Sequence, residues 1–323
     1  MTETSLIGWH GISARVPAEW TLAGVGGDRR QGYLRVDYEG LPRLQVKWAR
    51  RHIDLEKKRA EYVKRLTVSR RRRPTGMEVT TDVRVVSKRA KPGKDLLSYG
   101  WRPSGTLKGP IGVPKGGAHC GVGLLWNCEV CGRAVIAQVG WPIEEEGREV
   151  AQEVLESLDD HGIEGWETWG VDGLAFLTPE DYELEGWRRM TRYLELRLLR
   201  GREKLKVARW GMVPLVLKDR TVREWYEEAN LRRREVSWVS EDEQVKGHDG
   251  VVATGQRRRL AGGIRTRVAR ALGRSPAVEF EARAWHCPES NRLYLVEALS
   301  GGEGEALHGA VESLVCHEQV KGG

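Results

Sequence analysis

The chain has 323 residues, 40% of them hydrophobic, and a formal net charge of +7. This length predicts two domains of ordinary size, each with enough apolar residues for a core of its own. The sequence shows neither a stretch of roughly 20 apolar residues nor an opening basic segment that leads into an apolar one, so we expect a cytoplasmic protein without a membrane span. The five cysteines are odd in number and unevenly placed, which argues against a secreted disulfide framework.

The positive charge is concentrated near the start of the chain. Residues 1–120 hold 25 Lys and Arg against 11 Asp and Glu, an excess of +14, whereas residues 161–323 hold 26 of each. Such an asymmetry favours an anionic partner, with nucleic acid as one candidate and an acidic protein as another. A solvated surface rich in ion pairs would give the same composition without any partner.

Alternating apolar and polar residues, the pattern of half-buried strands, open the first half of the chain. Strands are expected within residues 11–22, 32–36 and 44–48, and a helix capped by Asp54 follows them. The rest of this half is expected to hold two strands, an apolar hairpin and a closing helix, at residues 78–86, 96–101, 122–139 and 151–158.

The second half repeats the first, which indicates a tandem duplication. Gly11, Pro17 and Leu22 recur 162 positions later as Gly173, Pro179 and Leu184, and the aromatic Trp20 is matched there by Tyr182. The string Glu-Ser-Leu occurs in both closing helices, as Glu156-Ser157-Leu158 and Glu312-Ser313-Leu314. We therefore predict a first repeat over residues 1–161 and a second over residues 162–323, with an arginine-rich insertion near residues 256–275.

Each repeat has roughly the order β-β-β-α-β-β-β-α. In the second, Thr221 and Glu224 have the spacing of a capping box and begin a helix whose apolar stripe includes Trp225. Runs of strands with few helices predict an α+β fold. The expected architecture is two similar tandem domains, each a mostly antiparallel sheet with two helices.

The proline before an aromatic residue (Pro17 and Trp20), the strand with Tyr33 and Leu34, and the closing helix resemble PsbP/Mog1-like domains. These are α+β sandwiches found in photosystem accessory proteins, transport cofactors and many prokaryotic proteins of mixed function. The resemblance would cover most of each half, and it implies a binding or scaffold role by analogy. A cysteine-containing hairpin is not part of that family's pattern.

One short motif occurs twice, each time on an expected hairpin: Trp126-Asn-Cys128-Glu-Val-Cys131-Gly-Arg133 and Trp285-His-Cys287-Pro-Glu-Ser290-Asn-Arg292. A Cys-x-x-Cys turn can offer two thiolates to one tetrahedral zinc ion, so Cys128 and Cys131 are candidate metal ligands, with His119 and Cys120 upstream as further ones. Ser290 replaces the second cysteine in the second copy, which favours a packing role for the motif in both hairpins. A redox pair is the third interpretation.

Clusters of arginine are the candidate anion-binding or nucleic-acid-binding residues, because arginines neutralise phosphates and release counterions. Residues 257–274 alone hold seven Arg and no acid. No helix-turn-helix or zinc-finger spacing accompanies them, so a membrane surface, an acidic protein or plain solvation remain alternatives. The candidates are Arg70, Arg71, Arg72, Arg73, Arg257, Arg258, Arg259, Arg265, Arg267, Arg270 and Arg274.

No catalytic residue is predicted. His248 with Asp249, and His119 with Asp95, are the two pairings of a histidine with an acid, and neither lies in a known catalytic motif. We therefore expect a non-enzymatic binding or scaffold protein with a basic surface, and nucleic acid is one candidate for its partner. The alternatives are a protein-assembly subunit without nucleic acid and a zinc or redox protein that uses the cysteine hairpin; no other cofactor is expected.

Overall fold

The computed structural model describes seven ranges of the chain: residues 3–68, 75–84, 95–104, 119–230, 236–257, 279–300 and 304–317. The chain divides into two compact units. Unit 1 comprises Met1–Ile163 with Thr168–Gly173, and unit 2 comprises Glu164–Glu167 with Leu174–Gly323.

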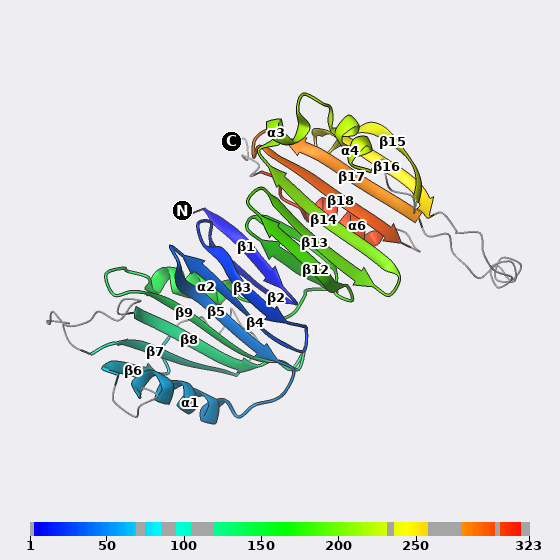
Figure 1. Ribbon diagram of the computed structural model, residues 1–323. Helices are drawn as coiled ribbons and strands as arrows, with labels where there is room; N and C mark the ends of the chain where they lie inside the picture. The colour runs from blue at the N-terminus through cyan, green and yellow to red at the C-terminus, as the bar shows by residue number, and fades with distance from the viewer. Residues whose placement is uncertain are drawn as a thin grey trace, which may run out of the picture. The chain divides into compact units, whose positions relative to one another are not determined.

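Unit 1 is built on a seven-stranded antiparallel sheet with the strand order β3-β4-β5-β9-β8-β7-β6 (Figure 1). Its strands are β3 (Thr21–Gly27), β4 (Gln31–Tyr38), β5 (Leu41–Ala49), β6 (Met77–Thr81), β7 (Leu96–Pro103), β8 (His119–Asn127) and β9 (Ala134–Pro142). A separate hairpin of β1 (Thr4–Trp9) and β2 (Ile12–Pro17) opens the unit. Gly170, in β10 (Trp166–Val171), pairs with Gly8 of that hairpin.

Among the described residues of unit 1, two helices pack on the sheet. Helix α1 (Leu55–Thr67) begins at Asp54, whose carboxylate accepts a hydrogen bond from the Lys57 amide, and it contacts β6, β7 and β8. Helix α2 (Arg148–Ser157) contacts β2, β8 and β9 through residues that recur at helical spacing. Since successive side chains of a strand point to opposite faces, Leu125 packs toward α1 while Trp126 points toward the chain that leaves α2.

Unit 2 repeats this sheet, with the strand order β12-β13-β14-β18-β17-β16-β15. Its strands are β12 (Glu183–Met190), β13 (Tyr193–Arg200), β14 (Glu203–Gly211), β15 (Val236–Val245), β16 (His248–Arg257), β17 (Glu279–Cys287) and β18 (Arg292–Ser300). Position by position along the sheet, the two orders have the same connectivity. The hairpin β17–β18 of unit 2 therefore occupies the place of β8–β9 in unit 1.

In the described part of unit 2, three helices accompany the sheet: α3 (Val213–Leu217), α4 (Val222–Asn230) and α6 (Glu305–Ser313). The capping box is confirmed, because the Glu224 amide donates to Thr221 Oγ1 at 3.1 Å and the Thr221 amide donates to Glu224 Oε2 at 2.8 Å. Trp225 then lies in a buried cluster with residues of β14, β16, β17 and β18. Helix α6 packs on β11 (Leu174–Pro179) and on β18.

The expected α+β class is wrong. Strands hold 56% of the described residues and helices 18%, in three antiparallel sheets with five short helices, so the fold is mostly β. One cause is that turns made by non-glycine residues were not recognised. The chain reverses at His10 and Gly11, which have φ of 52° and 83°, so residues 4–17 form a hairpin where a single strand was expected to begin. No helix in the described part of the chain is long and apolar enough to cross a membrane.

Candidate metal centre

Cys287 lies at the tip of the hairpin β17–β18. Strand β17 ends at this residue, and Arg292, the first residue of β18, is its partner across the ladder. The turn between them closes with a hydrogen bond from the Asn291 amide to the Pro288 carbonyl at 3.1 Å, and Asn291 takes the left-handed conformation that asparagine tolerates. This tight turn holds the thiol of Cys287 at the end of the sheet, fully buried.

Cys316 reaches the same place from the end of α6. The helix stops at Leu314, whose extended backbone directs the next residues back along the sheet. The Cys316 carbonyl then accepts a hydrogen bond from the Tyr294 hydroxyl at 3.3 Å and faces Cys287 Sγ at 3.7 Å. The segment after α6 is therefore tied to β18, with the Cys316 side chain buried.

Two histidines complete the cluster. His248 is the first residue of β16 and follows a tight turn at Lys246 and Gly247, both with positive φ. His317 follows Cys316 directly, and its ring meets that of His248 edge to face with 5.1 Å between the ring centroids. His248 is only 8% exposed, although histidine is usually found nearer the surface.

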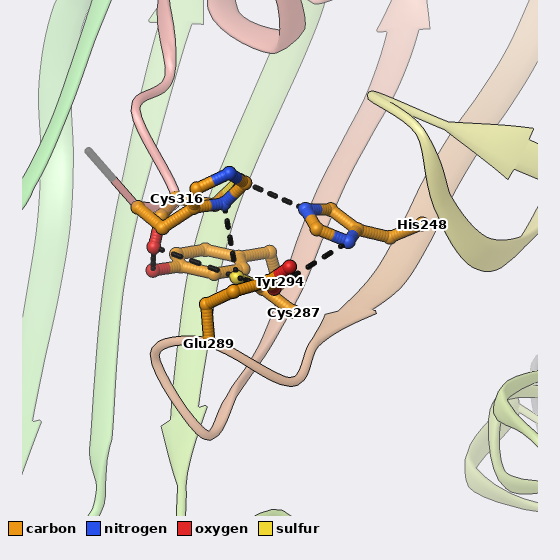
Figure 2. A network of polar contacts seen from close by, with 6 residues as sticks. His248, Cys287, Glu289, Tyr294 and Cys316 are labelled. Carbon is orange, nitrogen blue, oxygen red and sulfur yellow. Dashed lines mark hydrogen bonds and ion pairs between the residues drawn. The ribbon is translucent and has the colours of Figure 1, made fainter. Parts of the chain in front are cut away.

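The distances among these four side chains fit a tetrahedral ion. Cys316 Sγ lies 3.4 Å from His248 Nε2 and 3.4 Å from His317 Nδ1, and Cys287 Sγ lies 3.3 Å from His317 Nδ1. All four ligand atoms lie within 4.8 Å of one another. Around a tetrahedral zinc ion, sulfur and nitrogen ligands are about 3.6 Å apart, given Zn–S and Zn–N bonds of about 2.3 and 2.0–2.1 Å. Figure 2 shows Cys287, Cys316 and His248 converging on this space.

A carboxylate stands behind the cluster. Glu289 Oε2 lies 3.8 Å from His248 Nδ1 and 3.3 Å from Cys287 Sγ (Figure 2). Its own backbone amide, and then the Cys287 thiol, lower the pKa of this carboxyl, so it is an anion at neutral pH. Since His248 turns Nε2 toward the sulfur, its Nδ1 faces the carboxylate, and this is the arrangement that orients metal-binding histidines.

The Cys316 thiol is buried beside that of Cys287. Burial raises the pKa of Cys316, and the neighbouring Cys287 raises it further. The indole N–H of Trp285 opposes this effect, because it favours the Cys316 thiolate. A bound cation would favour the thiolates far more strongly.

In unit 1, the structure places Cys128 and Cys131 together with Asp160, and their ligand atoms lie within 4.8 Å of one another. Burial, followed by the Asp160 carboxylate, raises the pKa of Cys131 to about 12. Such a thiol is a poor redox nucleophile at neutral pH. His119 and Cys120 are at the far end of β8, so Cys120 and Cys128 are separated by eight residues, or about 27 Å along a strand. They are not ligands of the same ion as Cys128.

The structure describes only some of the other predicted site residues. His248 is in the unit 2 cluster with Cys287 and Cys316, but Asp249 is not its acid, because Asp249 Oδ1 accepts from Gln244 Nε2 at 2.6 Å. Arg257 ends β16, and nothing is described of its side chain. The remaining arginines lie outside the described residues, so the anion-binding surface stays a prediction: Arg70, Arg71, Arg72, Arg73, Arg258, Arg259, Arg265, Arg267, Arg270 and Arg274.

Sequence reasoning missed Asp160, Cys316 and His317. A pattern that could have revealed them lies just beyond the shared Glu-Ser-Leu string. The residues two and three positions after that leucine are Asp160 and His161 in the first copy, and Cys316 and His317 in the second. All four are metal-ligand types, and both pairs follow a closing helix whose end returns to the cysteine hairpin.

No sequence model of a known family matches this chain, and no curated protein matches it in sequence. The resemblance to PsbP/Mog1-like domains therefore stays a prediction.

Proposed function

We propose that this chain is a zinc-binding protein in which unit 2 holds one Zn²⁺ as a structural ion. The four ligands would be His248, Cys287, Cys316 and His317. The observation that carries the proposal is the set of three sulfur–nitrogen distances of 3.3–3.4 Å between side chains from three separate parts of the unit. A site with four protein ligands leaves no position for a substrate, so the ion supports the fold and performs no catalysis.

The ligand chemistry favours zinc over harder cations. Two thiolates and two neutral imidazoles balance the charge of a divalent ion, and thiolates do not suit Mg²⁺ or Ca²⁺. The carboxylate of Glu289 behind His248 supplies the outer contact that zinc-binding histidines usually have.

The ion would connect parts of unit 2 that are distant in sequence. It would join the β15–β16 turn, the β17–β18 turn and the segment that follows α6. Helix α6 has nine residues, too few to be stable without tertiary contacts. By holding the segment that follows α6 against the sheet, the ion would stabilise the C-terminal part of the unit. Such a structural role suits a binding or scaffold protein. An anionic partner for such a scaffold is still proposed on the sequence alone.

Metal analysis of the purified full-length chain tests the proposal. We expect zinc to co-purify, the ion of unit 2 to be lost in the Cys287→Ser and Cys316→Ser variants, and the same ion to be retained in Cys120→Ser, whose thiol belongs to neither cluster. Removal of the ion by a chelator should lower the melting temperature, and added zinc should restore it. Metal content that is the same in Cys287→Ser as in the wild type would contradict the proposal.

A further inference from the structure

Unit 1 carries a hairpin built like that of unit 2 but with different ligands. The turn between β8 and β9 is closed by hydrogen bonds from the Cys128 amide to the Arg133 carbonyl at 2.8 Å and from the Gly132 amide to the Cys128 carbonyl at 2.9 Å. Gly132 has a φ of 67°, as Asn291 has a φ of 50° at the equivalent position 159 residues later. The two turns therefore present Cys128 and Cys287 in the same way.

Asp160 is held against this hairpin from the end of α2. Its neighbour Asp159 exchanges two backbone hydrogen bonds with Ser13 of β2, at 2.8 and 3.0 Å, which fixes the chain at this point. The Asp160 side chain is fully buried, and its Oδ2 accepts from Trp126 Nε1 at 3.0 Å and lies 3.6 Å from Cys131 Sγ. A carboxylate and two thiols thus meet in a small space.

We propose that Cys128, Cys131 and Asp160 form a second metal site, with the chemistry of zinc or a similar divalent transition ion. Two sulfurs and one carboxylate oxygen within 4.8 Å of one another are a ligand set that zinc accepts. This site does not depend on the one in unit 2, because all three ligands belong to unit 1. With three protein ligands, its fourth position remains open to water or to an incoming ligand.

A buried arginine beside the cluster supports this assignment. Arg133 is 7% exposed, and its Nη1 donates to the Asp160 carbonyl at 2.9 Å. A divalent ion with two thiolates and one carboxylate has a net charge of −1, which the guanidinium would neutralise. In unit 2 the two thiolates and two neutral imidazoles already balance the ion. Unit 2 has Arg292 at the equivalent position, but that arginine is half-buried whereas Arg133 is buried, so the more buried cation lies in the unit whose ligands have the greater negative charge.

His161, the residue after Asp160, borders the space in which the fourth coordination position of the proposed ion would lie. His161 Nδ1 lies 2.8 Å from the Gly162 carbonyl. The other ring nitrogen, Nε2, lies 4.0 Å from Asp160 Oδ1, on a ring that is 31% exposed. His161 therefore lies beside Asp160, at the sequence position that corresponds to His317 in unit 2, without being part of the three-ligand cluster.

Titration of the metal-free full-length chain with Co²⁺ tests the second site, because thiolate ligands give Co²⁺ strong charge-transfer and visible absorption. We expect two Co²⁺ per chain. Asp160→Asn and Cys131→Ser should each bind one, and Cys287→Ser should also bind one. Asp160→Cys introduces the ligand that unit 2 uses, so it should keep both ions and increase the thiolate charge-transfer absorption.

The outcomes separate the two sites. One Co²⁺ in the wild type that is lost in Cys287→Ser but unchanged in Asp160→Asn and Cys131→Ser overturns the unit 1 site and leaves the unit 2 site intact. The reverse pattern supports unit 1 and removes unit 2. The Asp160→Cys variant guards against loss through misfolding, because an unchanged spectrum together with a native circular dichroism spectrum would also overturn the proposal.

Discussion

Trp126 and Asp160 are joined by a hydrogen bond from the indole N–H to the buried carboxylate, at 3.0 Å. At the corresponding place in unit 2 the indole N–H of Trp285 favours the thiolate of Cys316. In both hairpins, the tryptophan thus lies beside a side chain that arrives from the end of the closing helix. The two units share this arrangement and differ in that side chain, which is the Asp160 carboxylate in unit 1 and the Cys316 thiol in unit 2.

Replacement of Trp285 by Phe tests the role of the indole donor. The ring stacks on Tyr294 with 5.3 Å between the centroids, and phenylalanine keeps most of that contact while removing the N–H. Because the Cys316 thiolate loses a donor, we expect the zinc affinity of unit 2 to fall about 10-fold, the lower end for outer contacts of a metal site. Competition with a chromophoric chelator measures it. Trp126→Phe is the matched control and should leave the unit 2 affinity unchanged.

Glu289→Gln tests the carboxylate behind His248. The Glu289 side chain is 54% exposed, so the substitution should leave the fold intact. Loss of its charge weakens the orientation and basicity of His248, and we expect zinc affinity to fall about 10- to 100-fold. Equilibrium competition for zinc gives the ratio directly, with Glu241→Gln, an exposed position on β15, as control. Equal affinities in the two variants would show that Glu289 does not serve the site.

Local features of this fold could be predicted from the sequence because neighbouring residues determine them. The capping box of Thr221 and Glu224 is one example, since both partners lie within one turn of helix. The hairpin motif that occurs once in each unit is another example, because the residues of its turn determine where the chain reverses. The turn at His10 was missed because a non-glycine residue in the left-handed region leaves no clear mark in the sequence.

The metal cluster could be predicted only in part, because its members are far apart in sequence. Cys128 and Cys131 are three residues apart, whereas Cys287 and Cys316 are 29 residues apart and meet only after α6 has packed. No local pattern encodes that distance. The duplication was the available guide, and it led to the cysteine hairpins but not to the residues that reach them from the closing helices.

The buried histidine at the β1–β2 turn predicts a pH dependence of stability. Burial, followed by the charge of Arg133, lowers the pKa of His10 from 6.5 to about 4. Because the unfolded chain binds the proton more readily, the native state is fully favoured above pH 6.5 and loses stability as the pH falls from there toward 4. Between pH 7 and pH 5 this loss is about 2 kcal/mol, since one pKa unit corresponds to about 1.4 kcal/mol.

His10→Asn isolates this effect, because asparagine does not titrate and tolerates the left-handed backbone at this position. Urea unfolding of metal-free protein at pH 7 and pH 5 gives the free energy of unfolding for wild type and variant. The variant should lose about 2 kcal/mol less than the wild type over this interval. His52→Asn, at an exposed histidine, should behave as the wild type. A variant with the full wild-type pH dependence would exclude His10 as its source.

The strongest test of a structural role for the ion concerns α6, whose exit carries two of the four ligands. Without metal the segment is still tied to β18 by the hydrogen bond from Tyr294 to the Cys316 carbonyl, so α6 should remain folded but open more often. Amide hydrogen exchange of the zinc-loaded wild type and of Cys287→Ser should show faster exchange in Glu305–Ser313 of the variant.

Helix α4 provides the internal comparison for this measurement, because it lies in the same unit and packs on the sheet through Trp225 and Tyr226, with no residue in the metal cluster. Its exchange should change much less than that of α6. If α6 and α4 respond equally, the ion stabilises unit 2 globally. If neither responds, the contact between Tyr294 and Cys316 suffices to hold the helix, and zinc has no structural role there.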